Sequence, residues 1–202
     1  MYLDNPLVGI DYRPGWMAAD QAAALFECLL RGVAWQVHRI QMFGRWLDAP
    51  RLSCWMGDAD AHYRYSGSDF IPQPWQADVA RLRDCLNRAL AADFNSVLLN
   101  QYRDGCDSMG WHRDDEPELG PAPLIASLSL GATRRFVLKE GDGRRPLGRD
   151  NPRHVFNLAA GDLLLMHGDS QCRYRHALPK TAKPVGARIN LTFRRIIVGC
   201  GG

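Results

Sequence analysis

The stretch RINLTFRRI, residues 188–196, alternates polar and apolar side chains along its length. Its polar positions are Arg188, Asn190, Thr192 and Arg194. A period of two residues is typical of a β-strand, so the stretch predicts a strand with one polar and one apolar face. A surface strand would show the same pattern. If the polar face points inward instead, two buried arginines need anionic partners, and a dicarboxylate would supply them.

Five more short, β-rich runs precede this strand and are separated by Gly, Pro and Asp. They are SVLLNQY (96–102), LIASLSL (124–130), RRFVLKE (134–140), HVFNL (154–158) and DLLLMHG (162–168). Strands at such spacing indicate a β-sandwich or barrel. Residues 33–67 also alternate and turn like strands.

Two helices are expected to pack on one face of this β-core. Residues 17–31 are rich in helix formers, and Gly32 after them fits a C-cap. A second helix is expected from about Pro74 to Ala92, with Pro74 in its first turn. Its apolar positions recur at helical spacing: Val79, Leu82, Leu86 and Leu90. The fold class is therefore α+β with a mainly β core, in a single domain over residues 1–202.

The chain has 202 residues, of which 46% are hydrophobic and 23% are charged. These values fit one globular domain and argue against disorder. No apolar run approaches the roughly 18 residues of a membrane helix. The N-terminal sequence MYLDNPLVGIDYRPGW (1–16) has no basic segment followed by an apolar core, so we expect no secretory signal. The expected location is intracellular, in the cytoplasm of a bacterium or the nucleus of a eukaryote.

The basic residues are almost all arginine, 22 of 25, and they are distributed unevenly. Residues 1–112 carry 10 basic and 13 acidic side chains, whereas residues 113–202 carry 15 and 9. Arginine binds phosphates and carboxylates through a bidentate fork, although a coding bias would also enrich it. The basic C-terminal half favours an anionic partner.

The six cysteines form no CxxC or CxxH pair: Cys28, Cys54, Cys85, Cys106, Cys172 and Cys200. A zinc knuckle and a disulfide scaffold are both disfavoured, and most of these thiols are expected to be buried.

His112 and Asp114 are two residues apart, so in a strand their side chains would face the same side. An imidazole and a carboxylate supply two of the three ligands of a 2-His-1-carboxylate iron site. The third ligand is His167 or His176, and spacing alone does not choose between them. The other histidines fit surface or hydrogen-bonded positions: His38, His62 and His154.

An iron site of this type leaves coordination positions open and needs an electron-rich co-substrate such as 2-oxoglutarate. Asn100 and Tyr102 share one face of the strand that leads toward His112. Their amide and phenol groups could donate hydrogen bonds to a carboxylate of that co-substrate.

Together these motifs resemble the AlkB family of Fe(II)- and 2-oxoglutarate-dependent nucleic-acid repair dioxygenases. The resemblance covers about residues 33–197. The matching pieces are NQYRDGCDSMGWHRDDE (100–116), SLSLGATRRFVL (127–138), HALP (176–179) and RINLTFR (188–194). Three further pieces resemble the eukaryotic AlkB homologue that repairs duplex DNA: MFGRW (42–46), HYRYSG (62–67) and PQPW (72–75). Tyr65 departs from that homologue, which has Phe there, and this leaves the duplex preference open.

The resemblance implies a double-stranded β-helix, or jelly roll, over about residues 94–197, with a nucleotide-recognition lid over about 33–70. It selects His176 as the distal ligand, so the implied Fe(II) ligands and catalytic residues are His112, Asp114 and His176. Arg188 resembles the arginine that binds the distal carboxylate of 2-oxoglutarate, and Arg194 the one near the keto-acid end. The remaining implied 2-oxoglutarate contacts are Asn100, Tyr102, Asn190 and Thr192.

The same resemblance assigns substrate-binding residues. Tyr63, Arg64 and Tyr65 would hold a flipped base, although the two tyrosines would also fit ordinary strand packing. The aromatic wedge that fills the vacated stack would be Phe43, followed in the same finger by Gly44 and Arg45. Acidic contacts to a cationic methylated ring would come from Asp115 and Glu116. A basic loop, which would either bind phosphates or simply be solvated, contains Arg144, Arg145, Arg149 and Arg153.

The implied reaction is oxidative demethylation of 1-methyladenine and 3-methylcytosine in DNA. It converts 2-oxoglutarate and O2 to succinate and CO2 and releases formaldehyde. The partner is DNA, including duplex DNA by base flipping, or RNA; we expect no membrane partner and a monomer. The alternatives are a demethylase of RNA or single strands and a catalytically silent nucleic-acid-binding module. A structural metal protein is disfavoured because the candidate ligands leave coordination positions open.

Overall fold

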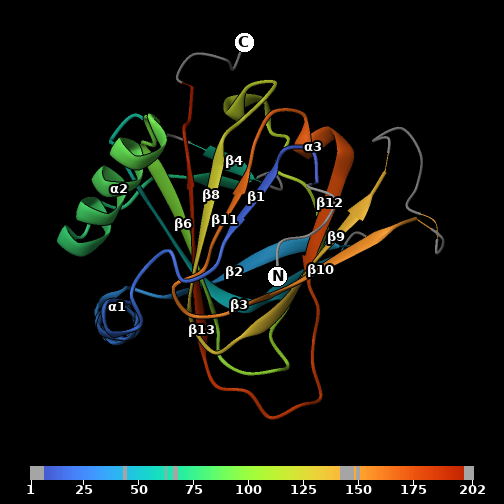
Figure 1. Ribbon diagram of the computed structural model, residues 1–202. Coiled ribbons are helices and arrows are strands. Elements are labelled where there is room, and N and C mark those ends of the chain that lie inside the picture. The colour runs from blue at the N-terminus through green and yellow to red at the C-terminus, as the bar shows by residue number, and fades with distance from the viewer. Residues whose placement is uncertain are drawn as a thin grey trace.

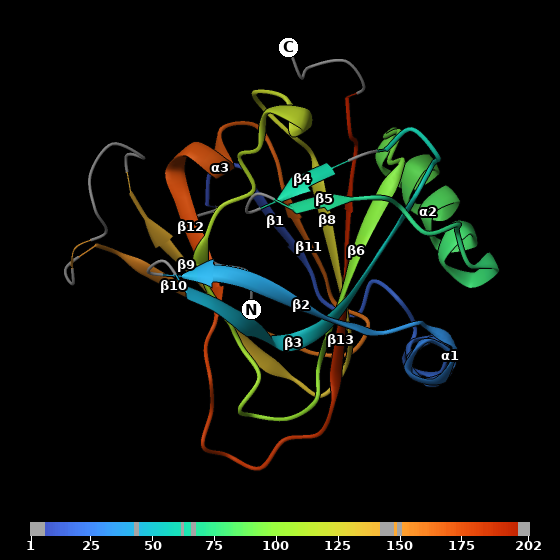
Figure 2. The same ribbon diagram turned by 180° about the vertical axis from the view of Figure 1, so that it is seen from behind.

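Two β-sheets pack face to face in the computed structural model of this chain (Figure 1). The structure describes residues 7–42, 45–61, 63–65, 68–141, 148 and 151–197, with the backbone alone at 40–42, 45, 63–65 and 68–70. The larger sheet has the strand order β1-β11-β8-β13-β6-β3-β2, and the smaller has the order β10-β9-β12-β7. A separate two-stranded sheet is formed by β4 and β5 (Figure 2).

The strands of the larger sheet are β1 (Ile10–Arg13), β2 (Gln36–Met42), β3 (Arg45–Gly57), β6 (Ser96–Tyr102), β8 (Ile125–Gly131), β11 (Leu163–Met166) and β13 (Arg188–Arg194). Those of the smaller sheet are β7 (Met109–His112), β9 (Arg134–Glu140), β10 (Arg153–Leu158) and β12 (Tyr174–Leu178). The separate pair is β4 (Tyr63–Tyr65) and β5 (Ser68–Phe70). The helices are α1 (Ala19–Gly32), α2 (Ala77–Leu90), α3 (Ser170–Arg173) and a 3-10 turn at Pro117–Leu119.

The six predicted β-runs all form strands of these two sheets, and the mainly β jelly-roll fold is confirmed. Residues 36–42 and 45–57 form β2 and β3, which continue the larger sheet beyond β6. Among the described helices, none is long and apolar enough to cross a membrane.

Helices α1 and α2 cover the outer face of the larger sheet (Figure 1). Val79, Leu82 and Leu86 of α2 are buried there, as their spacing predicts, and Leu90 packs against the same cluster. The predicted helix ends were wrong. Gly32 is the last residue of α1 and not its C-cap, and α2 begins at Ala77 and not at Pro74. Gln73 exchanges backbone hydrogen bonds with β3, which keeps the chain extended just before α2.

A second apolar cluster fills part of the space between the two sheets. The larger sheet contributes Ile125, Leu164 and Met166, and the smaller sheet contributes Phe136, Leu138, Phe156, Leu158 and Tyr174. Burial of side chains from both inner faces is what holds two such sheets together. Next to this cluster the inner faces become polar, and a pocket opens between the sheets.

Asp162 ties the N-terminal strand to this sandwich. Its buried carboxylate accepts hydrogen bonds from Tyr12 Oη (2.7 Å), the Gly15 amide (2.9 Å) and the Ala159 amide (2.8 Å). We expect Asp162→Ala to lower the free energy of unfolding by about 3 kcal/mol, because three donors lose their acceptor in a poorly solvated place. Urea denaturation measures this change.

The matched control is Asp169→Ala, since Asp169 is half exposed and pairs with the half-exposed Arg173. Such a pair contributes less than about 1 kcal/mol. Equal stabilities of the Asp162→Ala and Asp169→Ala variants would contradict the structural role given to Asp162.

Candidate functional site

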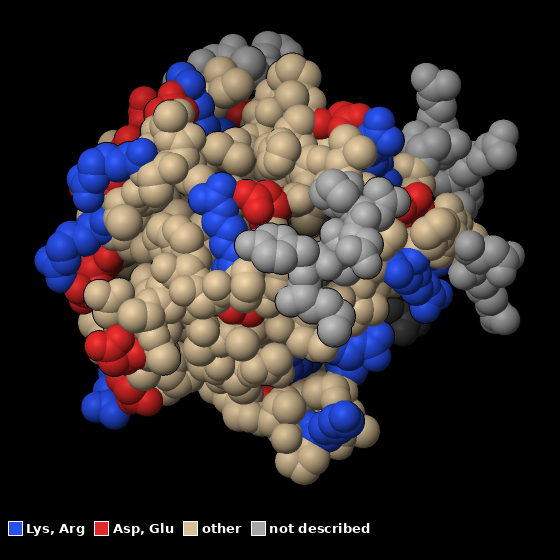
Figure 3. Space-filling model, in the orientation of Figure 1, with Lys and Arg blue, Asp and Glu red and all other residues tan. Residues whose placement is uncertain are grey.

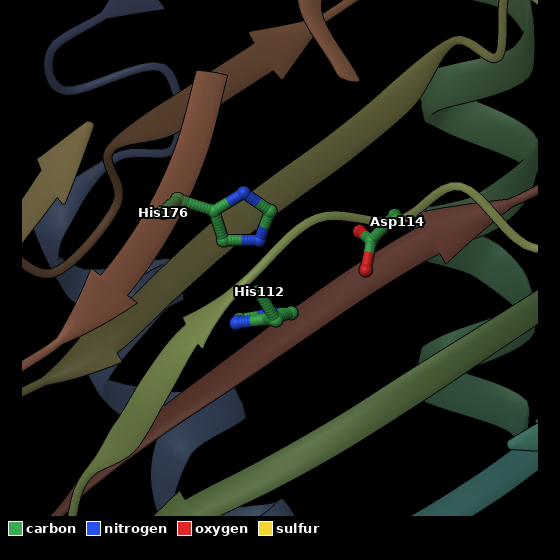
Figure 4. A group of neighbouring side chains, drawn as sticks. All are labelled: His112, Asp114 and His176. Atoms are coloured by element: carbon green, nitrogen blue, oxygen red, sulfur yellow. The ribbon is translucent and has the colours of Figure 1, made fainter. Parts of the chain in front are cut away.

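His112, Asp114 and His176 converge in the pocket between the two sheets (Figure 4). Their potential ligand atoms all lie within 4.8 Å of one another. His176 is in β12 and is the cross-strand partner of His112 in β7, so the pairing of these strands places both imidazoles together. His176 is therefore the histidine that joins His112 and Asp114, whereas His167 is exposed and lies outside the cluster.

The predicted strand geometry of the His112–Asp114 pair was wrong in one respect. β7 ends at His112, and Asp114 lies in the coil that follows. A two-residue strand period therefore does not aim the carboxylate. Tertiary contacts do: Arg194 of β13 donates to Asp114 Oδ2 from Nη2 at 2.8 Å and from Nε at 3.3 Å.

The protonation states of the three side chains suit a divalent cation. Burial alone would raise the pKa of Asp114, but Arg194 and the two imidazoles outweigh it and hold the pKa at about 2. Burial lowers the pKa of His176 to about 3, and His112 acts in the same direction. Burial also lowers the pKa of His112. Neutral imidazoles and an ionised carboxylate are the forms that bind a metal ion.

A backbone contact orients the first imidazole. His112 Nδ1 lies 2.8 Å from the carbonyl oxygen of Gly110, to which it can only donate. Nε2 of the neutral ring is then the atom with a free lone pair, as in most metal-bound histidines.

Side chains from both sheets line the pocket. The lining comprises Leu98, Asn100, Tyr102, Met109, His112, Asp114, Ser127, Phe136, Met166, His176, Leu178, Asn190, Thr192 and Arg194. As expected, Asn100 and Tyr102 lie on one face of β6, and the polar positions of β13 lie on one face of that strand. All seven residues of β13 are buried, so the surface-strand interpretation of this stretch is wrong.

Arg188 adjoins the pocket and is fully buried. Its Nη2 donates to Ser129 Oγ (2.9 Å) and Asn190 Oδ1 (3.3 Å), and its guanidinium lies 5.4 Å from the centre of the Tyr102 ring. Nε and Nη1 are buried and have no hydrogen-bond partner within the described part of the chain. Burial lowers the pKa of Arg188 to about 10. A buried cation with two unused donor nitrogens is suited to an anionic ligand.

Asn190 supports this arginine. Its Nδ2 donates to Ser127 Oγ (3.0 Å) and to the Leu128 carbonyl (3.1 Å), while its Oδ1 accepts from Arg188. Its amide is thus already engaged by protein groups. The structure therefore fits Asn190 better as a support of Arg188 than as a direct contact to a small ligand.

Arg51 was not singled out from the sequence. It is buried in β3, and its Nε donates to Asn100 Oδ1 at 3.0 Å. With its oxygen so engaged, the Asn100 amide presents its N–H groups as the remaining donors. Arg51 follows Pro50 and belongs to no sequence motif, so no local pattern selects it. It reaches Asn100 because β3 pairs with β6, and a single sequence does not reveal the register of two strands.

Several predicted substrate residues fall outside what the structure describes. Phe43 and Gly44 lie outside the described residues, and so do Arg144, Arg145 and Arg149. Of Arg45, Tyr63, Arg64 and Tyr65, the structure describes the backbone alone. Asp115 is half exposed and pairs with Arg113, with Oδ2 2.5 Å from Nε. Glu116 is partly buried just before the 3-10 turn, and Arg153 is exposed in β10.

The donor set fits a metal ion with a dicarboxylate beside it. Two imidazoles and one carboxylate that share one side of a cation leave coordination positions open, as in non-haem iron oxygenases. The unused donors of Arg188 and the N–H groups of Asn100 lie next to that site. Negative charge from a dicarboxylate would balance the buried guanidinium.

Comparison with known proteins agrees with this geometry. The model of the 2OG-Fe(II) oxygenase superfamily matches residues 9–194. The chain is 42% identical to DNA oxidative demethylase ALKBH2 of Homo sapiens, over 79% of this chain and 62% of that protein. It is 36% identical to alpha-ketoglutarate-dependent dioxygenase alkB homolog 3 of Bos taurus, over 91% of this chain and 64% of that protein.

Among solved structures, that of OsALKBH1 superposes with a TM-score of 0.66 at 18% identity, covering 96% of this chain and 99% of that one. At this identity the likeness concerns the fold. The chain spans less than two thirds of the length of the human and bovine relatives.

Proposed function

This chain belongs to the 2OG-Fe(II) oxygenase superfamily and, within it, to the AlkB family; on this premise we propose that it oxidatively demethylates N-methylated bases of nucleic acid. The observation that carries the proposal is the cluster of His112, Asp114 and His176, the last two of them buried, beside Arg188, whose guanidinium has donors that no described residue uses. We propose that the protein acts in the compartment that holds its nucleic-acid substrate, the cytoplasm or the nucleus.

His112, Asp114 and His176 would hold Fe(II), which supplies the activation of O2 when bound. The Arg194–Asp114 contact occupies Oδ2, so the other carboxylate oxygen is the one available to the cation. Burial of Asp114 and His176, with His112 partly buried beside them, limits the access of bulk water to the remaining coordination positions and strengthens electrostatic interactions in the pocket.

2-Oxoglutarate would lie along the polar face of β13 and β6. Arg188 would bind its distal carboxylate through Nε and Nη1, assisted by the Tyr102 hydroxyl. Asn100 would donate to the carboxylate near the keto group, with Thr192 and Arg194 on the same lining. This assignment leaves each carboxylate facing N–H or O–H donors of the chain.

The balanced reaction joins one oxygen atom of O2 to the N-methyl carbon and the other to the succinate formed as 2-oxoglutarate loses CO2. The hydroxymethyl group then leaves as formaldehyde: its O–H proton is lost, the C–N bond breaks, and the bonding electron pair stays on the ring nitrogen, which neutralises the cationic ring. The proposed substrates are 1-methyladenine and 3-methylcytosine. Both rings are cationic, so the carboxylates of Asp115 and Glu116 would favour them over normal bases.

The proposed lid is the segment over about residues 33–70. Tyr63, Arg64 and Tyr65 would hold the flipped base against His112, and Phe43, Gly44 and Arg45 would form the finger that replaces it in the stack. Removing a base from a duplex costs a few kcal/mol, so such a wedge matters most for duplex substrates.

A row of basic side chains on the outer face of the smaller sheet supports a nucleic-acid partner. Lys139 of β9 is the cross-strand partner of Arg153 in β10 and of Arg175 in β12, so the three side chains project from one face. Lys139 itself is buried, donates to the Gly148 carbonyl and lies over Trp111, so Arg153 and Arg175 are the side chains of the row that a phosphate could reach. Within the described ranges, no acidic side chain pairs with Arg153 or Arg175. Like charges in register repel one another, and a phosphate backbone would relieve that repulsion.

The helical side of the molecule is different. The basic side chains over α1 and α2 lie beside acidic ones (Figure 3), as in the ion pairs Arg31–Glu27 and Arg81–Asp78. The outer face of the smaller sheet, where no described acidic side chain pairs with Arg153 or Arg175, is therefore the better candidate for phosphate contacts.

We expect the double variant Arg153→Gln, Arg175→Gln to bind duplex DNA with a shallower salt dependence. The slope of log K against log salt concentration should fall by about 0.9 for each phosphate that the variant no longer neutralises, or about 1.8 in all. Fluorescence anisotropy with a labelled oligonucleotide at several salt concentrations measures the slope. Arg31→Gln, Arg81→Gln is the matched control and should keep the wild-type slope; a wild-type slope in the first double variant would contradict the assignment.

The proposed function is tested by comparing substrates. Oligonucleotides with one 3-methylcytosine or 1-methyladenine are offered as single-stranded DNA, duplex DNA and RNA, and kcat/KM for repair is measured with added Fe(II) and 2-oxoglutarate. Repair of any of them supports the demethylase, and the ranking assigns the strand preference. Tight binding of these oligonucleotides with repair of none of them would instead indicate a catalytically silent binding module.

A further inference from the structure

Gln171 is a buried amide next to the proposed metal site, although the sequence gives no reason to select it. It lies in α3, the single turn that leads into β12, and is 4% exposed. Its Oε1 accepts a hydrogen bond from the backbone N–H of Asp114 at 2.9 Å. The segment that carries His176 is thereby tied directly to the segment that carries Asp114.

The Gln171 amide is itself held in place. Its Nε2 donates to Ser170 Oγ at 3.3 Å and approaches Met166 Sδ at 3.6 Å. With the nitrogen engaged on that side, the oxygen is directed at Asp114. Met166 also lines the pocket, so this contact connects the amide to the pocket wall.

Asp114 needs such a contact because no strand holds it. His112 is fixed by the pairing of β7 with β12, but β7 ends there and Asp114 lies in coil. Arg194 binds the Asp114 carboxylate and Gln171 binds its backbone amide. With both contacts the main chain and the side chain are each restrained, and the free carboxylate oxygen keeps one position relative to the imidazoles.

We propose that Gln171 is a positioning residue, which fixes the backbone of Asp114 so that its carboxylate is aimed at the metal held by His112 and His176. This inference rests on the proposed function, because it presupposes that the three side chains bind a metal ion. Neighbours that orient a metal ligand through hydrogen bonds typically change metal affinity about 10–100-fold when they are removed.

The first test is the affinity of the metal-free full chain for Mn(II), measured by the electron paramagnetic resonance signal of free Mn(II). Gln171→Met keeps the side-chain length but removes the acceptor, and we expect about tenfold weaker binding. Gln101→Met is the matched control. Gln101 is also a buried glutamine, but it lies on β6 and its Oε1 accepts no hydrogen bond from the described residues. We expect wild-type affinity in this control.

Two further measurements separate positioning from general stability. The d–d absorption bands of bound Co(II) should change in position and intensity in Gln171→Met and stay unchanged in Gln101→Met, since they report ligand geometry. In the wild-type protein without metal, amide hydrogen exchange followed by NMR should be much slower at Asp114 than at Asp115. This last measurement needs no variant, so it stands even if Gln171→Met does not fold.

The outcomes distinguish this inference from the function on which it rests. If the wild-type chain binds no Mn(II), the metal site itself is wrong. If the wild type binds Mn(II) and Gln171→Met binds it equally well with the same Co(II) spectrum, the site stands and the positioning role is overturned. Exchange at Asp114 as fast as at Asp115 would also overturn that role.

Discussion

The variant His112→Ala is expected to lose demethylation down to the background of the assay. His112 offers an oriented imidazole, with Nδ1 fixed to the Gly110 carbonyl, and its removal leaves one imidazole and one carboxylate for the cation. Loss of a hydrogen-bonded neighbour of a ligand already lowers metal affinity or activity by about 10–100-fold, so loss of the ligand should exceed this. Formaldehyde release from a 3-methylcytosine oligonucleotide measures the rate.

The matched control for this variant is His167→Ala. His167 is an exposed histidine that lies outside the cluster, so the variant should keep the wild-type rate. A His112→Ala variant that turns over as fast as His167→Ala would exclude His112 from the metal site and the cluster from the reaction.

The variant Arg188→Met is expected to raise the KM for 2-oxoglutarate roughly thirtyfold or more. Truncating one partner of a buried, hydrogen-bonded charge pair costs about 2–5 kcal/mol, and thirtyfold is the lower end of that range. The fully buried guanidinium has two donors that no described residue uses. Initial rates at increasing 2-oxoglutarate concentrations, with methylated substrate saturating, measure the KM.

Two variants control for this result. Arg195→Met removes the exposed arginine just beyond β13, which pairs with Asp93, and should keep the wild-type KM. Arg188→Lys keeps the charge but loses the planar fork, so its KM should lie between those of the wild type and of Arg188→Met. A wild-type KM in Arg188→Met would show that the dicarboxylate binds elsewhere.

Much of the fold was predictable from local pattern. The polar and apolar alternation of β13 and the apolar spacing of α2 each belong to one element, and both are found as expected. The helix ends were less predictable. Gln73 pairs with β3, and because of this long-range contact α2 begins only at Ala77. Propensity cannot foresee such contacts.

The sequence predicts which residues form the candidate site better than it predicts which contacts bring them together. Residue spacing left His167 and His176 open, and the pairing of β12 with β7 brings His176 to His112. Asp114 reaches the cluster through Arg194 and Gln171, which follow it by 80 and 57 positions in the sequence. Arg51 and Gln171 carry no local pattern at all. Their roles depend on strand register and on a one-turn helix, which a single sequence does not specify.

The most direct measurement of the central claim is the ratio of the two products in a single reaction. The full chain, loaded with Fe(II), is incubated with 2-oxoglutarate, O2 and an oligonucleotide carrying one 3-methylcytosine, and both succinate and formaldehyde are quantified. We expect the two products in a one-to-one ratio, with neither formed when Fe(II) or 2-oxoglutarate is omitted. Succinate without formaldehyde, or neither product despite bound metal, on this and on the 1-methyladenine oligonucleotide would contradict the account.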